Sequence, residues 1–163
     1  MYCTLEYIEL PRFGEILESS IEQIIKYLAT DGLQQENKKM LFNPNCPVQI
    51  LLEYLCSEIG LDQDVDYDLC ELSTGDLVNI KKLQQWSYAT NVLKIKQSYA
   101  FVIFQKDDFG VYKVFEPILN RHSKQCSDIL IRFKRQKRTT KRSGSVVKRT
   151  SRTSSASKAS SRR

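Results

Sequence analysis

The distribution of apolar residues confines any folded core to the first 133 residues. Beyond Phe133 the only apolar residues are two valines and two alanines, whereas Lys or Arg occurs twelve times and Asp or Glu never. A segment of this composition buries too little apolar surface to offset the entropy that it loses on ordering. We therefore expect residues 134–163 to form a disordered basic tail rich in Ser and Thr.

The body and the tail carry opposite charge. The net charge of the chain is +6, so removing the twelve basic residues of the tail leaves 13 basic and 19 acidic residues, or −6, in residues 1–133. With 41% hydrophobic residues overall and all 16 aromatic side chains in this part of the chain, the body is large enough to bury a single-domain core.

The first half of the chain shows two helical patterns. Residues 2–10 alternate loosely between apolar and polar, as in a strand, and residues 15–28 have apolar residues at helical spacing. Residues 40–42 predict a short strand. The apolar face of residues 48–59 then predicts a helix, which Gly60 ends.

The second half is dominated by strand patterns. Strict alternation predicts a half-buried strand over residues 64–72, and residues 95–104 give the strongest strand signal of the chain. The remaining segments predict a second strand at 77–80, a short helical turn within 86–93, a hairpin turn at 107–110 that leads into a strand at 111–115, and an amphipathic piece of ambiguous type at 127–135.

This order of elements resembles the ubiquitin-like β-grasp from its second strand onward. Residues 88–95 running into 98–103 are similar to the helical turn and final strand of ubiquitin. The resemblance implies an α+β fold, in which a mixed sheet packs on one main helix and an extra helix precedes it. Either the helix at 15–28 is an insertion after the first strand, or the N-terminal segment is foreign to the domain. The expected division is 1–39, a strand and helix segment; 40–119, the β-grasp-like domain; 120–133, a connection; and 134–163, the tail.

A closer resemblance covers residues 40–104. Its motifs are Phe42-Asn43-Pro44-Asn45-Cys46, the aliphatic run from Val48 to Leu55, Gly60-Leu61 and Asp68-Leu69-Cys70-Glu71. They are similar to a family of small uncharacterised animal proteins that includes an open-reading-frame protein of human chromosome X. The family is sometimes labelled a "putative interleukin-2 receptor gamma chain". It has no established activity to transfer, and the sequence lacks the signal peptide, membrane span and disulfide pattern of a receptor.

The cysteines and the single histidine argue against an enzyme. The five cysteines are odd in number and widely spaced without a Cys-x-x-Cys pair, so we expect reduced thiols and no metal site. Any nucleophile–histidine pair must use His122, and no phosphate-binding or nucleophile-elbow motif is present. We expect no cofactor, no catalytic residue and an intracellular protein that is cytoplasmic, nuclear or both.

The tail carries the strongest candidate site. Its dense basic cluster is a candidate for binding polyanions or for nuclear import, because Lys and Arg gain from displacing counterions on nucleic acid, acidic tubulin tails or anionic lipid. Phosphorylation of nearby serines would cancel that attraction. The alternative is a solubilising segment without a dedicated partner. The basic candidates are Lys134, Arg135, Lys137, Arg138, Lys141 and Arg142, and the phosphorylation candidates are Ser143, Ser145, Ser151 and Ser155.

A second candidate is the acidic row Asp64, Asp66 and Asp68, which alternation places on one strand face as a docking surface for a basic partner. The alternatives are a solvated acidic face and a calcium loop, but Tyr67 stands where such a loop requires glycine. Trp86 and Tyr88 are expected to pack in the core or at an edge rather than to stack on bases.

These features together predict a non-enzymatic protein-interaction module, an adaptor with an unidentified protein partner, whose basic tail engages an acidic surface. The alternative is a nucleic-acid or chromatin-associated protein that binds non-specifically through the tail.

Overall fold

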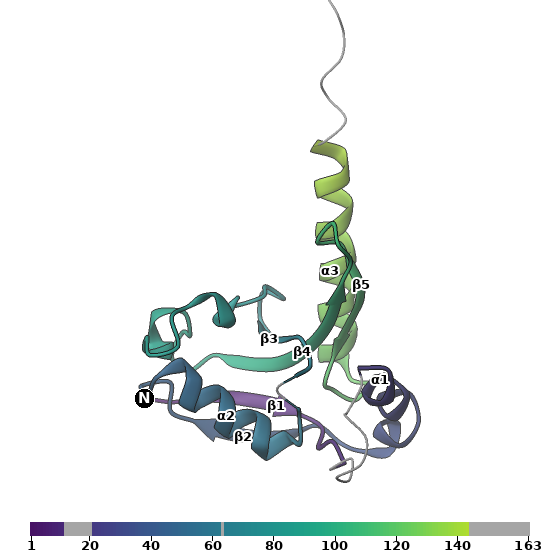
Figure 1. The fold of residues 1–163 in the computed structure, drawn as a ribbon. Coiled ribbons are helices and arrows are strands. Elements are labelled where there is room, and N and C mark those ends of the chain that lie inside the picture. The colour runs from purple at the N-terminus through teal and green to yellow at the C-terminus, as the bar shows by residue number, and fades with distance from the viewer. Residues whose placement is uncertain (12–20, 63, 144–163) are drawn as a thin grey trace, which may run out of the picture.

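The computed structural model describes residues 1–11, 21–62 and 64–143. These residues form an α+β fold with a mixed open sheet and three α-helices (Figure 1). The strands are β1 (Cys3–Tyr7), β2 (Lys38–Phe42), β3 (Tyr67–Glu71), β4 (Ser98–Lys106) and β5 (Tyr112–Pro117), and the helices are α1 (Ile21–Ala29), α2 (Val48–Ile59) and α3 (Lys124–Ser143).

The sheet has the order β2-β1-β4-β3, with β1 and β4 parallel at its centre. The β1–β2 and β3–β4 pairs are antiparallel, and β5 pairs antiparallel with the far end of β4. Ile8 donates its backbone N–H to the Ile118 carbonyl, and Ile118 donates to Phe101. The segment after β1 is therefore hydrogen-bonded to the segment after β5. The two strands pair with the same edge of β4, β1 along its first half and β5 along its second half.

Helix α2 covers one face of the sheet and builds the main core. Its buried residues Leu51, Leu55 and Ile59 belong to one apolar cluster with Leu5 of β1 and Phe101 of β4. Gly60 ends the helix at φ +76°, and a Cβ there would lie 2.7 Å from the Leu10 carbonyl oxygen. A residue with a side chain would be strained on both counts, which explains the glycine at this position.

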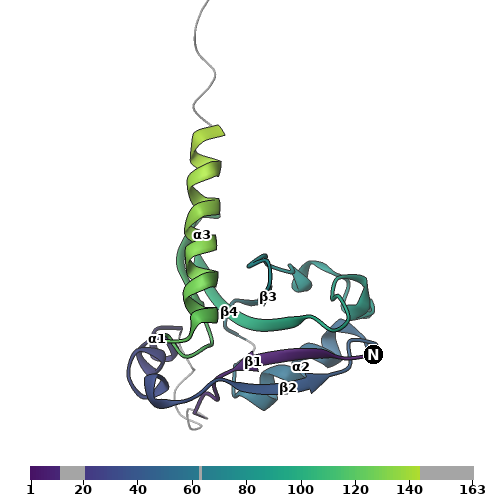
Figure 2. The same cartoon turned by 180° about the vertical axis from the view of Figure 1, so that it is seen from behind.

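The first half of α3 covers the opposite face. Figure 2 shows α3 in front of β4 and β5, on the side of the sheet away from α2. A second apolar cluster lies between them and consists of Cys70, Ala100, Val102, Leu119, Cys126 and Ile129. Strand β4 is therefore buried on both faces, as its unbroken run of apolar residues requires.

The N-terminal strand belongs to the same sheet as the rest of the body. β1 lies between β2 and β4, so it pairs across the predicted boundary between residues 1–39 and residues 40–119. Helix α1 falls between the paired strands β1 and β2, which is the arrangement that the insertion alternative describes. The predicted helix began at residue 15, and its residues 15–20 lie outside the described residues.

Local predictions held where the pattern was strong. The helix at 48–59 with its glycine stop and the hairpin around residues 107–110 are confirmed. The predicted strand at 77–80 is wrong, because only Leu77 forms an isolated bridge, to Cys70, and a 3₁₀ turn follows at Ile80–Lys82. The Asp68 carboxylate accepts the backbone N–H groups of Asn79 and Ile80, which diverts the chain from a strand ladder.

Order extends further toward the C-terminus than expected. Helix α3 continues to Ser143, so residues 134–143 of the predicted tail are helical in the structure. Extending a helix whose first turns are already held by packing costs little, since each further residue gains one hydrogen bond. Residues 144–163, including Ser145, Ser151 and Ser155, lie outside the described part. No helix within that part is both long and apolar enough to cross a membrane.

Candidate functional site

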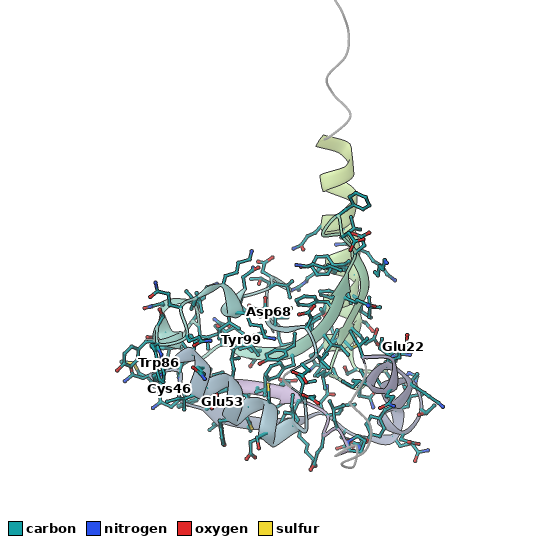
Figure 3. All side chains as sticks on the ribbon, viewed as in Figure 1. Glu22, Cys46, Glu53, Asp68, Trp86 and Tyr99 are labelled. Carbon is teal, nitrogen blue, oxygen red and sulfur yellow. The ribbon has the colours of Figure 1, made fainter. Side chains whose placement is uncertain are left out.

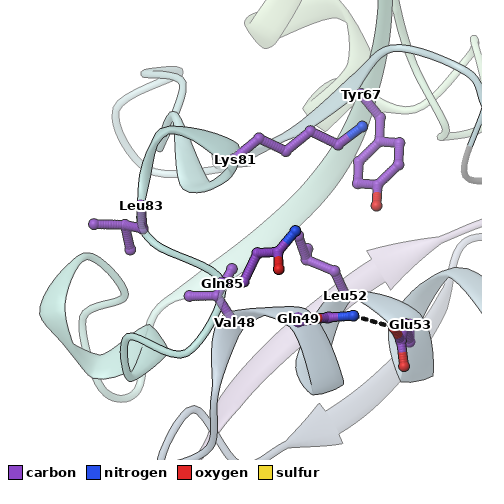
Figure 4. A pocket seen from close by; sticks show the side chains of 8 residues that line it. All are labelled: Val48, Gln49, Leu52, Glu53, Tyr67, Lys81, Leu83 and Gln85. Atoms are coloured by element: carbon purple, nitrogen blue, oxygen red, sulfur yellow. Dashed lines mark hydrogen bonds between the residues drawn. The ribbon is translucent and has the colours of Figure 1, made fainter.

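A cleft of about 300 Å³ lies between α2 and the loop that follows the 3₁₀ turn at Ile80–Lys82 (Figure 4). Its two walls come from segments that are distant in the sequence, and the Tyr67 ring stands at one end. The lining residues are Val48, Gln49, Leu52, Glu53, Tyr67, Lys81, Leu83 and Gln85.

Backbone hydrogen bonds hold the loop wall against the start of α2. The N–H groups in the first turn of a helix have no partner inside the helix. Here Val48 donates to the Ser87 carbonyl over 2.9 Å and Gln49 donates to the Gln85 carbonyl over 3.1 Å, while Pro47 and Tyr88 form an isolated bridge. The loop thus completes the helix end and is held beside the start of α2.

The Lys81 side chain lies over the ring of Tyr67, with Nζ 3.5 Å from the ring centroid. This distance is typical of a cation–π contact, which places the ammonium inside the cleft. Burial raises the pKa of Tyr67 well above its ordinary value, and burial also raises the pKa of the neighbouring Cys56 thiol. Both groups are therefore neutral at physiological pH, and Lys81 supplies the charge at this end of the cleft.

The α2 wall carries the opposite charge. Gln49 donates from Nε2 to the Glu53 carboxylate over 3.0 Å, as Figure 4 shows. Across the described ranges, Glu53 has no cation within 4.0 Å and Lys81 has no carboxylate within that distance. The cleft therefore joins an apolar floor to two walls of opposite, unneutralised charge.

Two aromatic side chains are exposed on the same loop. Trp86 is 68% exposed and Tyr88 is 52% exposed, so neither side chain packs in the core. Figure 3 places Trp86 and Cys46 at the same end of the body, opposite Glu22 of α1. The sequence does not reveal this exposure, because only the bonds to the start of α2 turn the loop outward.

The acidic row is only partly on the surface. Asp64 and Asp66 are exposed, but Asp68 is 5% exposed, so its assignment to a docking face is wrong. Its carboxylate accepts the backbone N–H groups of Leu69, Asn79 and Ile80 over 2.7–3.1 Å. Burial raises the pKa of Asp68, and these hydrogen bonds oppose the rise. Asp68 has a structural role, because it holds the turn that begins the loop wall of the cleft.

The second candidate site is the basic half of α3. Three side chains fix the helix where it leaves the body: the Phe133 ring stacks on Phe115, Arg132 donates to the Ser73 carbonyl, and Gln136 donates to the Asp76 carboxylate over 3.0 Å. Lys134 and Arg135 lie in this stretch and are exposed. Beyond it α3 projects away from the sheet (Figure 1).

All six basic candidate residues lie on this one helix. Lys134, Arg135, Lys137, Arg138, Lys141 and Arg142 fall within α3, and no acidic residue follows Asp128. At 1.5 Å per residue, residues 134–143 span about 15 Å of helix. Of the four phosphorylation candidates, the structure describes only Ser143, the last residue of α3.

The remaining reactive groups do not assemble into a site. The five cysteines are free thiols, and burial raises the pKa of Cys70 to about 12 and of Cys126 to about 11. His122 is exposed in the turn before α3. No group of three or more metal-ligating side chains comes together among the residues that the structure describes.

A comparison with known proteins gives one family. The model of the family described as "Putative Interleukin 2 receptor, gamma chain" matches residues 35–123, which confirms the resemblance seen over residues 40–104. No curated protein and no solved structure matches the chain. The match contains every residue that lines the cleft and ends before the basic half of α3 begins.

Proposed function

We propose that this chain, which belongs to the family described as "Putative Interleukin 2 receptor, gamma chain", is a non-enzymatic adaptor. Its body binds a protein through the cleft, and the basic half of α3 engages an acidic surface. The description is a label for the family, and no receptor activity is transferred from it to this chain.

The continuity of α3 carries the proposal. One helix is docked on the sheet through Cys126, Ile129 and Phe133 and then continues as a segment with six Lys or Arg among ten residues. Charges on a docked helix lose little conformational entropy on binding, whereas charges on a disordered tail must be ordered first. The basic half of α3 also lacks an apolar stripe, which favours an acidic protein or nucleic acid over a lipid surface.

The fold that supports this role is, in our proposal, the ubiquitin-like β-grasp. The order β2-β1-β4-β3, the parallel central pair and the packing of α2 on one face all support it. This chain departs from the pattern by the insertion of α1 and by α3 on the second face.

Two further points belong to the same proposal. The five free thiols support a reducing, intracellular compartment, which is cytoplasmic, nuclear or both.

Phosphorylation at Ser143, Ser145, Ser151 and Ser155 would weaken the attraction of the basic residues for an acidic surface, because each phosphate adds about −1.5 to −2 charges next to them. Glutamate at these four positions should weaken binding to an acidic probe, and unchanged affinity would remove this part of the proposal.

The chain offers a matched test of the basic helix. Six of the twelve basic residues after Phe133 lie in α3 and six lie after it, so each set can be replaced by Gln with the same loss of charge. The probe is a fluorescein-labelled polyglutamate peptide, followed by anisotropy as NaCl rises from about 50 to 200 mM. The variant in α3 should lose markedly more affinity than the distal variant. Equal losses would contradict the proposal, because they would mean that only the number of charges matters.

A second candidate function is non-specific binding of nucleic acid or chromatin. The observation that favours it is the helical form of the basic segment, since a helix about 10–12 Å across fits a major groove about 12 Å wide. A labelled duplex DNA in the same assay separates the two functions. Much tighter binding to DNA than to polyglutamate at equal salt would favour the nucleic-acid function over the adaptor.

A further inference from the structure

We infer that the cleft beside α2 binds an extended peptide segment of a partner protein in which a large apolar side chain stands next to a carboxylate. This inference rests on the proposed adaptor function and names the chemistry that its body recognises. The apolar side chain would enter the cleft, and the carboxylate would bind Lys81.

The floor of the cleft is suited to one apolar side chain. Val48 and Leu52 are buried residues of the main core whose outer surface lines the cleft, and Leu83 closes it from the opposite wall. A volume of about 300 Å³ is at the lower end of the range for small-molecule sites, about 300–1,000 Å³. It is therefore better suited to an anchoring side chain from a peptide than to a whole cofactor.

The charge on the Lys81 wall favours a carboxylate next to the apolar side chain of the peptide. Lys81 holds its ammonium over Tyr67, and no carboxylate among the described residues lies within ion-pair distance. A carboxylate brought by a ligand would meet this ammonium beside an apolar floor, where the attraction is stronger than in bulk water. Glu53 on the other wall accepts a hydrogen bond from the neutral Gln49 amide and keeps its charge, so a ligand carboxylate would lie at the Lys81 end of the cleft, away from Glu53.

The rim has the composition of a protein interface. Trp and Tyr are enriched at such interfaces because they add large, rigid contact area at low entropic cost. Trp86 and Tyr88 stand exposed on the loop that forms one wall, directly after the lining residue Gln85. A peptide that runs along the cleft would cover them.

The surrounding charge disfavours a nucleic acid at this position. The body has a net charge of −6, and Lys81 is the one cation among the residues that line the cleft. A strand of phosphates would therefore find few free cations here. A short acidic and apolar peptide needs only one of them.

The test is selection of a random-peptide library displayed on phage against the full-length chain, followed by synthesis of the enriched peptides in Trp-free form. Trp86 is the only tryptophan of the chain, so its fluorescence reports on the rim of the cleft. Enriched peptides should pair a large apolar residue with Asp or Glu, should shift the Trp86 emission, and should lose about tenfold in affinity on Lys81→Glu. Replacing the acidic residue of the peptide by Lys should restore binding to that variant.

The matched control is Lys113→Glu, which makes the same charge change at an exposed position of β5 outside the cleft. The inference is overturned if no sequence is enriched, if the two variants bind the peptides equally, or if a single-stranded oligonucleotide displaces them from Trp86. The Gln variant of the basic residues in α3 should keep peptide binding. Failure of peptide binding at the cleft can thus be distinguished from failure of the basic part of α3 to bind the acidic probe.

Discussion

The ring of Phe133 in α3 lies flat on the ring of Phe115 in β5, with the centroids 3.6 Å apart and the planes within 4° of each other. Tyr112 meets the edge of Phe133 at a centroid distance of 5.2 Å. Phe133 is also the last large apolar residue before the basic half of the helix. This stack therefore fixes the direction in which α3 leaves the sheet.

Phe133→Ala should lower the free energy of unfolding by about 1–3 kcal/mol, because it removes the stack and part of the contact between α3 and the β4–β5 hairpin. Phe109→Ala is the matched control, since Phe109 is 90% exposed in the turn of the same hairpin. Its effect should stay within about 0.5 kcal/mol. Urea denaturation followed by circular dichroism measures both, and equal effects would show that the stack contributes nothing.

Gly75→Ala should destabilise the protein more than Gly110→Ala. Both glycines have φ above +70°, so the backbone cost of alanine, about 1–2 kcal/mol, is common to the two. A Cβ at Gly75 would lie 2.7 Å from Cδ of Arg132, whereas a Cβ at Gly110 would meet nothing within 4 Å. The additional loss at Gly75 should be about 1 kcal/mol or more.

A double-mutant cycle checks the cause of that difference. In an Arg132→Ala background the difference between the two glycine substitutions in denaturation midpoint should become smaller, because Cδ at 2.7 Å is removed while Cβ at 3.2 Å remains. A difference that is unchanged by Arg132→Ala would mean that the long Arg132 side chain does not crowd this turn.

The features that the sequence predicted are those set by local pattern. The helix at 48–59 is marked by its apolar face and by Gly60, and the β4–β5 hairpin by its turn residues. The features that it missed depend on contacts between distant segments. Asp68 falls at a surface position of the alternating pattern, yet its carboxylate is buried and accepts the backbone N–H groups of residues 79 and 80. Strand β1 pairs in parallel with β4, some ninety residues later in the chain.

The cleft could not be predicted for the same reason. Its walls meet only because the start of α2 donates to carbonyl groups at residues 85 and 87, which no periodicity reveals. The six basic residues of α3 were identified from composition alone, but their helical presentation was not. Composition indicates only what it costs to order an isolated tail. It does not indicate that the basic segment continues a helix that is already docked on the sheet.

Thiol reactivity should single out one cysteine. Cys3, Cys56, Cys70 and Cys126 are buried and Cys46 is partly exposed, and burial raises the pKa of each thiol. With Ellman's reagent at mildly alkaline pH, Cys46 should react first, and the other four should react only after urea is added. Cys46→Ser should abolish the early phase. Rapid reaction of several thiols in the native protein would contradict the packing described above.

Glu71 should make stability sensitive to acid. Hydrogen bonds from Ser73 and Lys94 lower the pKa of this carboxyl below its ordinary value, so its contribution is present above the unfolded pKa of about 4.3. The contribution is lost as the pH falls through the lowered pKa. Glu71→Gln should therefore flatten the fall in unfolding free energy between about pH 5 and pH 3, and Ser73→Ala should flatten it in part. An unchanged slope in both variants would contradict this role.

The most direct measurement is the affinity of Gln136→Pro for the polyglutamate probe. Proline at residue 136 breaks α3 after Lys134 and Arg135 and before the other four basic residues of the helix, at a cost of about 3 kcal/mol to the helix, and leaves every charge in place. Gln136→Ala is the control, because it removes the hydrogen bond to Asp76 and keeps the helix. The account predicts that the proline variant binds several-fold more weakly than the alanine variant at equal salt. Equal affinities would contradict it, because the basic residues would then act as a flexible polyelectrolyte, independent of the helix that presents them.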